Sequence, residues 1–445
     1  MSAETSALLT DLYQLNMIQA YLDHGDTGTA VFELFCRTLP PRRGFLVAAG
    51  LQQALDYLEN LSFSADDIAW LRSTARFKPN VLDYFSSLRF TGDVHAMLEG
   101  TIFFANEPVL RVTAPLPQAQ LVETRLINIL HFQSLVAAKA ARCTLAAPGK
   151  VLVDFGLRRA HGAEAGLMAA RASYLAGFAG TATVLAGEMF DIPLYGTMAH
   201  SFIEAFDDES LAFETYARAR PNNLVFLLDT YDTEAAARKV VALAPKLKTD
   251  GIIVRAVRLD SGDLIALSKS VRSILDQGGL RDVTIFASGG LDEDSLVTFA
   301  KANAPIDGIG IGTSLTTSAD VPNIDFVYKM QEYAGLPRRK KSDKKATWPG
   351  RKQVWRRYDA DGRMTGDLLG LENSRGDGEP LLQPVMKDGR RLEASPPIEQ
   401  ARQRVKRSLE CLPEPLQRLD TVATYHVEVA AELKTLAAEV DRRMS

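Results

Sequence analysis

In the middle of the chain, short apolar runs that end in polar or glycine-rich tips alternate with helical segments. The anchor residues His200, Asp229, Asp260, Ser288 and Gly312, near these tips, are separated by 29, 31, 28 and 24 residues. A strand followed by a helix in a parallel sheet has this length. Runs such as LVFLL and GIIVRAV are apolar without alternation, which predicts strands buried on both faces. The apolar runs are KVLVDFGLRR, DIPLYGTMAHS, NLVFLLDTYD, GIIVRAVRLDSGD, VTIFASGGLD and DGIGIGTS.

Repeated strand–helix units of this kind predict an α/β fold. Because a polar motif follows each strand, we expect an incomplete (β/α) TIM-like barrel, whose chemistry lies at the carboxyl ends of its strands. The sequence contains six good strand candidates, fewer than a closed barrel needs. A doubly wound open sheet is the structural alternative.

The sequence changes in character on both sides of this series. Residues 1–115 mix helical patterns with short apolar runs, which predicts an N-terminal α/β domain. The cluster TAPLPQAQ marks its end, and the barrel is expected at 116–322. Residues 323–390 are broken by Pro and Gly and are expected to complete the N-terminal domain. Residues 391–445 predict a helical C-terminal region.

The overall charge and the cysteines exclude several classes of protein. A net charge of −4 gives no general attraction to nucleic acids or anionic membranes. Cys36, Cys143 and Cys411 are odd in number and far apart, which excludes a disulfide framework and a CxxC zinc site and suits a reducing compartment. The sequence shows no signal-peptide pattern at its start and no run of about 18 apolar residues. We therefore expect a cytoplasmic protein that binds neither nucleic acid nor membrane.

A basic run at residues 338–357 departs from this balance, with ten Lys and Arg residues against one acid. A solvated loop is the simplest interpretation. One alternative is a positively charged lid over a polyphosphate. The other, a nucleic-acid contact, is disfavoured because the chain as a whole is acidic.

A lone histidine stands in the stretch LYGTMAHSFIEAF. Ser201 and Glu204 form a Ser-x-x-Glu capping box, which predicts a helix that starts at Ser201. His200 would then lie one residue outside a helix N-terminus, where backbone N–H groups are unpaired and negative charge is favoured. That position suits a residue that meets a phosphate. The alternative is a buried neutral histidine in a loop.

The motif RLDSGDL follows a buried strand. Arg258 and Asp260 alternate with a leucine, so both side chains can point to the same side of the strand end. Arg258 could hold a carboxylate or phosphate, and Asp260 a sugar hydroxyl or a magnesium-bound water. Ser261 could cap the next helix. The alternative is a purely structural Arg–Asp pair.

Two glycine-rich turns, ASGGLDE and GIGIGTS, follow consecutive strands at the end of the series. Their backbone N–H groups would lie near helix N-termini and form a cradle for phosphate. Barrels bind phosphate near their last two strands, which fits this order. Ordinary tight turns are the alternative, since these also need glycine. The residues of the expected cradle are Gly289, Gly290, Gly310, Gly312, Thr313 and Ser314.

Two further motifs follow strands. In DFGLRRAHG, Phe155 could stack on a flat ring while Arg158 meets an anion, with Arg159 beside it. A core phenylalanine and surface arginines are an equally good interpretation. In VFLLDTYDT, Asp232 is expected to be a helix N-cap.

Taken together, these motifs closely resemble nicotinate phosphoribosyltransferases along most of the chain. The resemblance also rests on LLTDLYQLNM, VFELFCRTLPPRRGFLVAAGL and the segment from VYKM to PGRKQVWR. It implies a type II phosphoribosyltransferase, with an incomplete barrel and a head-to-tail homodimer that shares its active sites. It implies a ligase of NAD biosynthesis that converts nicotinate, phosphoribosyl diphosphate and ATP to nicotinate mononucleotide, diphosphate, ADP and phosphate.

The resemblance also implies roles for single residues. His200 matches the histidine that becomes a phosphohistidine, and Arg258 and Asp260 complete the catalytic group. Tyr13 would cross the dimer interface and stack the nicotinate ring against Phe155. Mg²⁺ would arrive with the substrate and meet Asp260 or Asp263, without a dedicated protein site. The implied nicotinate contacts are Tyr13, Phe155, Arg158, Thr197 and Arg258, and the implied phosphoribosyl diphosphate contacts are Ser261, Asp263, Gly289, Gly290, Gly310, Gly312 and Thr313.

One departure bears on the substrate. The related nicotinamide enzymes carry an Asp in a Gly-Thr-Asp-Thr stretch, which accepts the amide N–H. This chain has GTATV, with Ala182 in that place. A carboxylate there would repel the nicotinate anion, so its absence favours the acid over the amide. Nicotinamide phosphoribosyltransferase is the alternative function.

Overall fold

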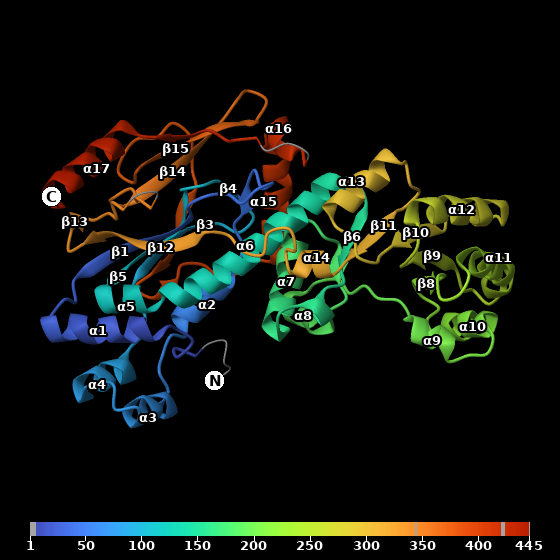
Figure 1. Ribbon diagram of the computed structural model, residues 1–445, viewed down its shortest axis with the longest axis horizontal. Coiled ribbons are helices and arrows are strands. Elements are labelled where there is room, and N and C mark those ends of the chain that lie inside the picture. Colours follow the sequence, from blue (N-terminus) through green and yellow to red (C-terminus); the bar gives the residue numbers. More distant parts are fainter. Residues whose placement is uncertain (1–5, 343–344, 420–422, 445) are drawn as a thin grey trace. The chain divides into compact units, whose positions relative to one another are not determined.

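The structure is a computed structural model that describes residues 6–342, 345–419 and 423–444. The chain divides into two compact units (Figure 1). The first unit is Met1–Ala138 with Asn323–Ser445, and the second is Lys139–Pro322. This division falls inside helix α6 (Glu123–Ala146), and the barrel start at residue 116 stays a prediction.

The second unit is built on a parallel sheet. Its strand order is β7-β6-β11-β10-β9-β8, so β7 and β8, which are consecutive along the chain, lie at opposite edges. The sheet is therefore open between them, which confirms the predicted α/β class and a curled parallel half-barrel (Figure 1). The strands are β6 (Val151–Asp154), β7 (Gly180–Thr181), β8 (Leu224–Leu227), β9 (Val254–Leu259), β10 (Thr284–Ala287) and β11 (Gly308–Ile311).

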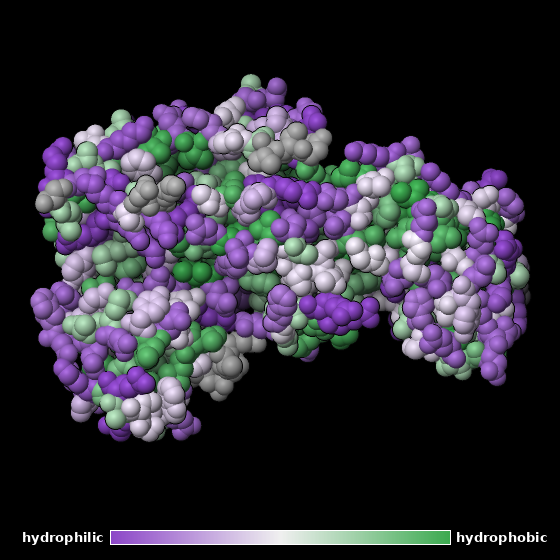
Figure 2. Space-filling view, in the orientation of Figure 1, coloured by the Kyte–Doolittle hydropathy of each residue, from purple (hydrophilic) through white to green (hydrophobic). Residues whose placement is uncertain are grey.

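Helices follow these strands, and four of them, α10 to α13, begin at an aspartate whose side chain caps the helix. Asp232 accepts from the backbone N–H of Ala235, as predicted. Hydrophilic residues dominate the surface over α10, α11 and α12 on the face shown in Figure 2. The helical segments of this unit are η2 (Leu157–Arg159), α7 (Ala163–Leu175), α8 (Val184–Phe190), α9 (His200–Glu204), α10 (Glu209–Ala219), α11 (Thr233–Thr249), α12 (Leu264–Gln277), α13 (Glu293–Lys301) and α14 (Thr313–Thr316).

One predicted strand of this unit is wrong. The run DIPLYGTMAHS is not a strand: β7 lies earlier, and Leu194 makes only an isolated bridge to Thr181. Leu194 is 54% exposed, so the apolar run does not reach the core. Pro193 also lacks the N–H that a paired strand needs.

The capping box is also absent. Helix α9 begins at His200 rather than Ser201, and its N-cap is Ala199, which has no polar side chain. Ser201 therefore lies inside the helix. The predicted cap of α12 is wrong in the same way: Asp263, not Ser261, accepts from the N–H groups of Ile265 and Ala266. A carboxylate at the N-cap position reaches these donors directly.

The first unit combines strands from both ends of the chain. Within the described residues its largest sheet has the order β13-β12-β1-β5-β3-β17-β18, and a second sheet has the order β16-β14-β15-β19. β2 and β4 form a separate pair. The strands are β1 (Thr29–Cys36), β2 (Leu46–Val47), β3 (Asp93–Met97), β4 (Ile102–Phe103), β5 (Pro108–Pro115), β12 (Phe326–Tyr333), β13 (Leu336–Pro337), β14 (Lys352–Tyr358), β15 (Met364–Leu371), β16 (Glu379–Pro380), β17 (Leu382–Lys387), β18 (Arg390–Arg391) and β19 (Val427–Val429).

The C-terminal region is mostly helical, but β19 also joins it to β15 in parallel. No helix in the described part of the chain is both long and apolar enough to cross a bilayer. The remaining helices of this unit are α1 (Leu12–His24), α2 (Leu51–Glu59), α3 (Ala65–Ser73), α4 (Pro79–Ser87), α5 (Leu116–Leu121), α15 (Ile398–Cys411), α16 (Glu414–Gln417) and α17 (Ala431–Met444).

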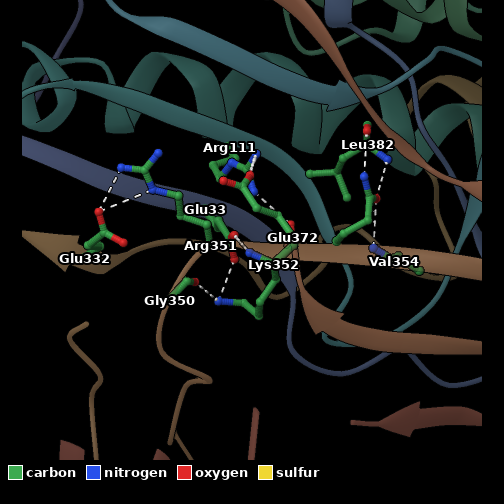
Figure 3. Close-up of polar contacts among 10 residues, drawn as sticks. Glu33, Arg111, Glu332, Gly350, Arg351, Lys352, Val354, Glu372 and Leu382 are labelled. Atoms are coloured by element: carbon green, nitrogen blue, oxygen red, sulfur yellow. Dashed lines mark hydrogen bonds and ion pairs between the residues drawn. The ribbon is translucent and has the colours of Figure 1, made fainter. Parts of the chain in front are cut away.

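The basic run 338–357 is only partly a solvated loop, because its last six residues, 352–357, belong to β14 of this unit. Figure 3 shows Lys352 of this run against Glu33 of β1. Lys352 Nζ lies 2.8 Å from Glu33 Oε2. Both side chains are almost fully buried. Burial lowers the pKa of Lys352 more than the pairing with Glu33 raises it. Arg111 donates to the Lys352 carbonyl oxygen and pairs with Glu372.

A second buried group lies between β14 and β15. Arg356 donates to both carboxylate oxygens of Asp367, and the Tyr425 hydroxyl donates to Asp367 Oδ1 at 2.9 Å. Glu107, also fully buried, accepts from the N–H of Phe104. Burial, and next the charge of Asp367, raises the pKa of Glu107 well above its usual value, although Arg356 opposes this. Burial and the neighbouring Asp367 carboxylate therefore favour the protonated form of Glu107.

We expect Glu107→Gln to fold and to lose part of the pH dependence of stability. A raised carboxyl pKa in the folded state stabilises the protein below the unfolded pKa of about 4.3, and this contribution is lost as pH rises toward the folded value. Glutamine has the same shape and cannot ionise. Urea midpoints at pH 5, 7 and 9, followed by the fluorescence of Trp70, Trp348 and Trp355, should fall less with pH in the variant. Equal slopes in both proteins would contradict the assignment.

Candidate active site

A cavity of about 320 Å³ opens at the carboxyl ends of β6, β9, β10 and β11. These strand ends meet at one edge of the parallel sheet, as in other barrels of this type. The sequence separates its lining residues by more than 150 positions, and the fold brings them together. The cavity is lined by Phe155, Arg158, Arg159, Arg258, Asp260, Ser288, Gly289, Gly290, Gly310, Gly312 and Thr313.

Arg258 is the centre of the site's polar contacts. Its Nη1 donates to Thr197 Oγ1 at 3.1 Å, and its Nε donates to Ser288 Oγ at 2.8 Å. Its Nη2 forms an ion pair with Asp260 Oδ1 at 2.6 Å. The guanidinium also lies over the ring of Phe155, 5.3 Å from its centroid. Four groups therefore fix the plane and position of this cation.

Asp260 is held as a carboxylate. Burial by itself raises the pKa of this carboxyl, but the hydrogen bond from Ser288 and the charge of Arg258 outweigh it and lower the pKa. The backbone N–H of Asp260 donates to Asp229 Oδ2 at 3.2 Å. Asp260 thus presents a negative charge at the cavity wall over the whole neutral pH range.

His200 lies beside this carboxylate. Its Nε2 is 4.0 Å from Asp260 Oδ2, and its Nδ1 is 3.1 Å from the Thr230 hydroxyl. The imidazole is 39% exposed, so a dissolved substrate can reach it. A buried histidine that only fills a loop is therefore excluded. Because α9 has only five residues, its dipole adds little, and the contacts of the ring define its environment.

The two glycine-rich turns pack closely against Asp260 and Phe155, because glycine has no side chain. A Cβ on Gly289 would lie 2.0 Å from the Asp260 carbonyl oxygen, and its φ of +100° favours glycine. A Cβ on Gly310 would lie 2.5 Å from the ring of Phe155. Gly290 and Gly312 line the same cavity. The turns therefore leave backbone N–H groups accessible to an anion.

Phe155 is positioned by the residue before it. Asp154 is buried and accepts from Thr181 Oγ1 at 2.7 Å and from the N–H of Gly156 at 2.8 Å. Burial raises the pKa of Asp154, and these two hydrogen bonds oppose the rise. The turn after β6 is thereby fixed. It places the ring of Phe155, together with Arg158, along the cavity wall.

Five predicted site residues lie outside the cavity lining: His200, Tyr13, Thr197, Ser261 and Asp263. Asp263 uses its carboxylate to cap α12, and the hydroxyl of Ser261 donates to Asp229 Oδ2 at 2.5 Å. Tyr13 belongs to the first unit, on α1, and is 47% exposed. Thr197 is connected to the site through Arg258. The roles implied for these residues stay predictions.

Sequence reasoning did not assign roles to Ser288, Thr230 and Asp229. All three lie within three residues of the end of a strand, which is the signal that could have identified them. Asp229 Oδ1 is buried and has no hydrogen-bond partner among the described residues. Such an oxygen is suited to a cation or a donor supplied by a ligand.

Family models match the chain in three segments. The N-terminal domain of nicotinate phosphoribosyltransferase matches residues 8–131, the nicotinate phosphoribosyltransferase family model matches 151–344, and the C-terminal domain matches 371–437. The cavity and His200 lie within the central match.

Curated relatives match most of the chain. The nicotinate phosphoribosyltransferase pncB2 of Mycobacterium tuberculosis is 47% identical over 426 residues, which span 95% of this chain and 91% of that protein. The nicotinate phosphoribosyltransferase of Bacillus subtilis is 40% identical over 89% of this chain and 80% of its own length.

Solved structures have the same fold. Human nicotinic acid phosphoribosyltransferase superimposes with a TM-score of 0.87 at 29% identity, over 97% of this chain and 100% of that chain. A nicotinate-nucleotide pyrophosphorylase from Pyrococcus furiosus has a TM-score of 0.75 at 25% identity, over 92% and 96% of the two chains.

Proposed function

The chain belongs to the nicotinate phosphoribosyltransferase family, and on this basis we propose that it makes nicotinate mononucleotide and diphosphate from nicotinate and phosphoribosyl diphosphate. In the reaction the pyridine nitrogen of nicotinate forms a bond to C1′ of the sugar. The bond from C1′ to diphosphate breaks, and diphosphate leaves with the electron pair. The product is a precursor of NAD.

The observation that supports this function is the composition of the cavity at the carboxyl ends of β6, β9, β10 and β11. It combines an aromatic ring, a fixed guanidinium and glycine turns within about 320 Å³. Phe155 offers a flat face to the pyridine ring, and Arg158 offers a positive charge to the nicotinate carboxylate. The glycine turns suit the phosphate of the sugar. Aligning the two reactants is the main task of such a site, because no covalent sugar intermediate is needed.

Charge develops in two places during this reaction. C1′ becomes positive as its bond to diphosphate lengthens, and the carboxylate of Asp260 can stabilise that charge. Arg258 balances the Asp260 carboxylate and also faces the anionic substrates. Because both groups are fixed before substrate binds, little reorganisation is required during the reaction.

We also propose that ATP turnover is coupled to this transfer through a phosphohistidine at His200. The imidazole would attack the terminal phosphorus of ATP, ADP would leave, and water would later release phosphate. Exposure of the ring and its contacts with Thr230 and Asp260 support this role. This makes the enzyme an ATP-coupled ligase.

The oxygen groups of the site suit Mg²⁺. Asp260 and the unpartnered Oδ1 of Asp229 are carboxylate oxygens, which this ion prefers together with water. Within the described ranges no three His, Cys, Asp or Glu side chains are grouped to hold a metal, and we propose that Mg²⁺ enters with the diphosphate group. When bound, it neutralises negative charge on that group.

We further propose a homodimer with shared active sites. The exposed Tyr13 on α1 would reach the pyridine ring bound at the partner subunit's Phe155. This arrangement would place aromatic rings on both faces of the pyridine. The cytoplasmic location expected from the sequence stays a prediction.

The base is proposed to be nicotinate rather than nicotinamide. Ala182 follows β7, is exposed, and donates its backbone N–H to the Asp154 carbonyl oxygen beside the Phe155 turn. A carboxylate at this position would face an anionic base, and alanine avoids that repulsion. The comparison of turnover on nicotinate and nicotinamide tests this choice, and faster amide turnover would show that the assignment is wrong.

We expect His200→Ala to retain slow transfer but to lose stimulation by ATP, because the histidine assists the transfer and does not form the glycosidic bond. The measurement is diphosphate release with and without ATP, combined with mapping of acid-labile label from γ-labelled ATP. Glu204→Ala, exposed on the same helix, is the matched control. Full ATP-stimulated activity in His200→Ala, with no label at His200 in the unaltered protein, would overturn the phosphohistidine proposal.

A further inference from the structure

Ser288 is buried at the carboxyl end of β10, with 2% of its surface exposed. Its hydroxyl oxygen accepts from Arg258 Nε at 2.8 Å, and its hydroxyl hydrogen is donated to Asp260 Oδ1. Chemistry sets the direction of both bonds, because a guanidinium can only donate and an ionised carboxylate can only accept. The hydroxyl is therefore held in one orientation between two opposite charges.

These contacts close a ring of three side chains. Arg258 Nη2 donates to Asp260 Oδ1, the same oxygen that Ser288 contacts. The other carboxylate oxygen, Oδ2, lies 4.0 Å from His200 Nε2. The hydroxyl thus keeps one oxygen of Asp260 on the arginine and leaves the other toward His200 and the cavity.

We propose that Ser288 is a positioning residue for phosphoribosyl transfer, which acts by aligning Arg258 and Asp260. The inference rests on the proposed function. Without the hydroxyl, the Nε of Arg258 and the Oδ1 of Asp260 each lose a charge-assisted hydrogen bond. The guanidinium, which lies over the ring of Phe155, is then free to rotate. The glycine turns that would bind the sugar phosphate keep their backbone conformation. The expected loss is therefore in kcat, with little change in KM for phosphoribosyl diphosphate.

Ser288→Ala is expected to lower kcat by about 10- to 100-fold, the effect of one or two hydrogen bonds to charged groups. Ser288→Thr keeps the hydroxyl and should restore most of the rate. The hydrogen bond from Ser288 helps to lower the pKa of Asp260, so its loss should move the acid limb of the kcat profile to higher pH. If Ser288 served only for packing, Ser288→Ala would not shift the acid limb, and Ser288→Thr would not restore the rate.

The matched control is Ser268→Ala in α12. Ser268 is as buried as Ser288, but its hydroxyl donates only to the Ile265 carbonyl oxygen within the helix. This variant should keep the rate and the pH profile of the unaltered protein. Melting curves of all variants establish folding. If the extra methyl group of Ser288→Thr prevents folding, Ser288→Cys keeps the size of serine with only a weak hydrogen-bonding group, and it should lose rate as Ser288→Ala does.

The outcomes separate this inference from the function on which it rests. If the unaltered protein makes nicotinate mononucleotide and Ser288→Ala has the same kcat and acid limb, the positioning role is wrong. If the unaltered protein makes none, the proposed function fails instead. In that case a crystal structure of Ser288→Ala decides: an arginine displaced from Asp260 supports the positioning role, and an unchanged ion pair overturns it.

Discussion

Replacement of Arg258 by alanine is expected to lower kcat/KM for nicotinate by about 100- to 1,000-fold, the effect of removing a preorganised charge from an active site. The guanidinium is fixed by Thr197, Ser288 and Asp260. Its loss would leave the Asp260 carboxylate unbalanced in a partly buried cavity, where it would repel the anionic substrates. The measurement is steady-state diphosphate release over a range of both substrates.

Arg258→Lys should recover little of this loss. An ammonium group is a single point charge and cannot match three acceptors that lie in the plane of a guanidinium. Arg255→Ala is the control, because Arg255 lies on the same strand and its side chain is exposed. Near-normal kcat/KM in Arg258→Ala would exclude the cavity as the active site.

Replacement of Glu293 by alanine is expected to destabilise the second unit by about 3–5 kcal/mol, the usual effect of breaking a buried ion pair from one side. Glu293, at the start of α13, is 1% exposed and pairs with Lys139 and with Arg142 at 3.2 Å. Both cations come from α6 and are also buried. Without the carboxylate, Arg142 would lose this ion pair in a space that excludes water, and Lys139 would be left with Asp320, at 2.8 Å.

Amide hydrogen exchange of β10 and β11 is the appropriate measurement, because Trp70, Trp348 and Trp355 all belong to the first unit. Protection in these strands should fall by a factor that corresponds to the lost stability. Arg238→Ala removes an exposed i,i+4 pair in the same unit and should change stability by about 0.5 kcal/mol or less. An equally small effect of Glu293→Ala would show that the buried pair is not needed.

The fold class of the second unit could be predicted from the sequence because strand burial and strand–helix spacing are local properties. The strands β8 and β9 can be recognised from the local sequence alone. Both faces of a parallel strand are covered, so its residues form a continuous apolar run. The run DIPLYGTMAHS, which contains His200, was wrongly predicted to be a strand, because its apolar character is also a local property. Its residues are apolar, but Pro193 and the exposed Leu194 show that it does not enter the core.

Helix starts were predicted less well, because several residues near a strand end can act as the cap. Asp232 was identified correctly, whereas Ser201 and Ser261 were not. At α12 the choice depends on where the chain leaves β9, and the tertiary path places Asp263 at the N-cap. Ser261 is thereby released to contact Asp229.

By itself, the sequence determined which chemical groups stand at the strand ends: the arginine and aspartate of RLDSGDL, the glycine turns and the histidine. Only the tertiary structure decided which of them share one cavity, and that the Ser288 hydroxyl lies between Arg258 and Asp260. The physical reason is that a parallel sheet aligns the ends of strands that are distant in the chain. Distances across neighbouring strands depend on the register and twist of the sheet, and no local pattern encodes them.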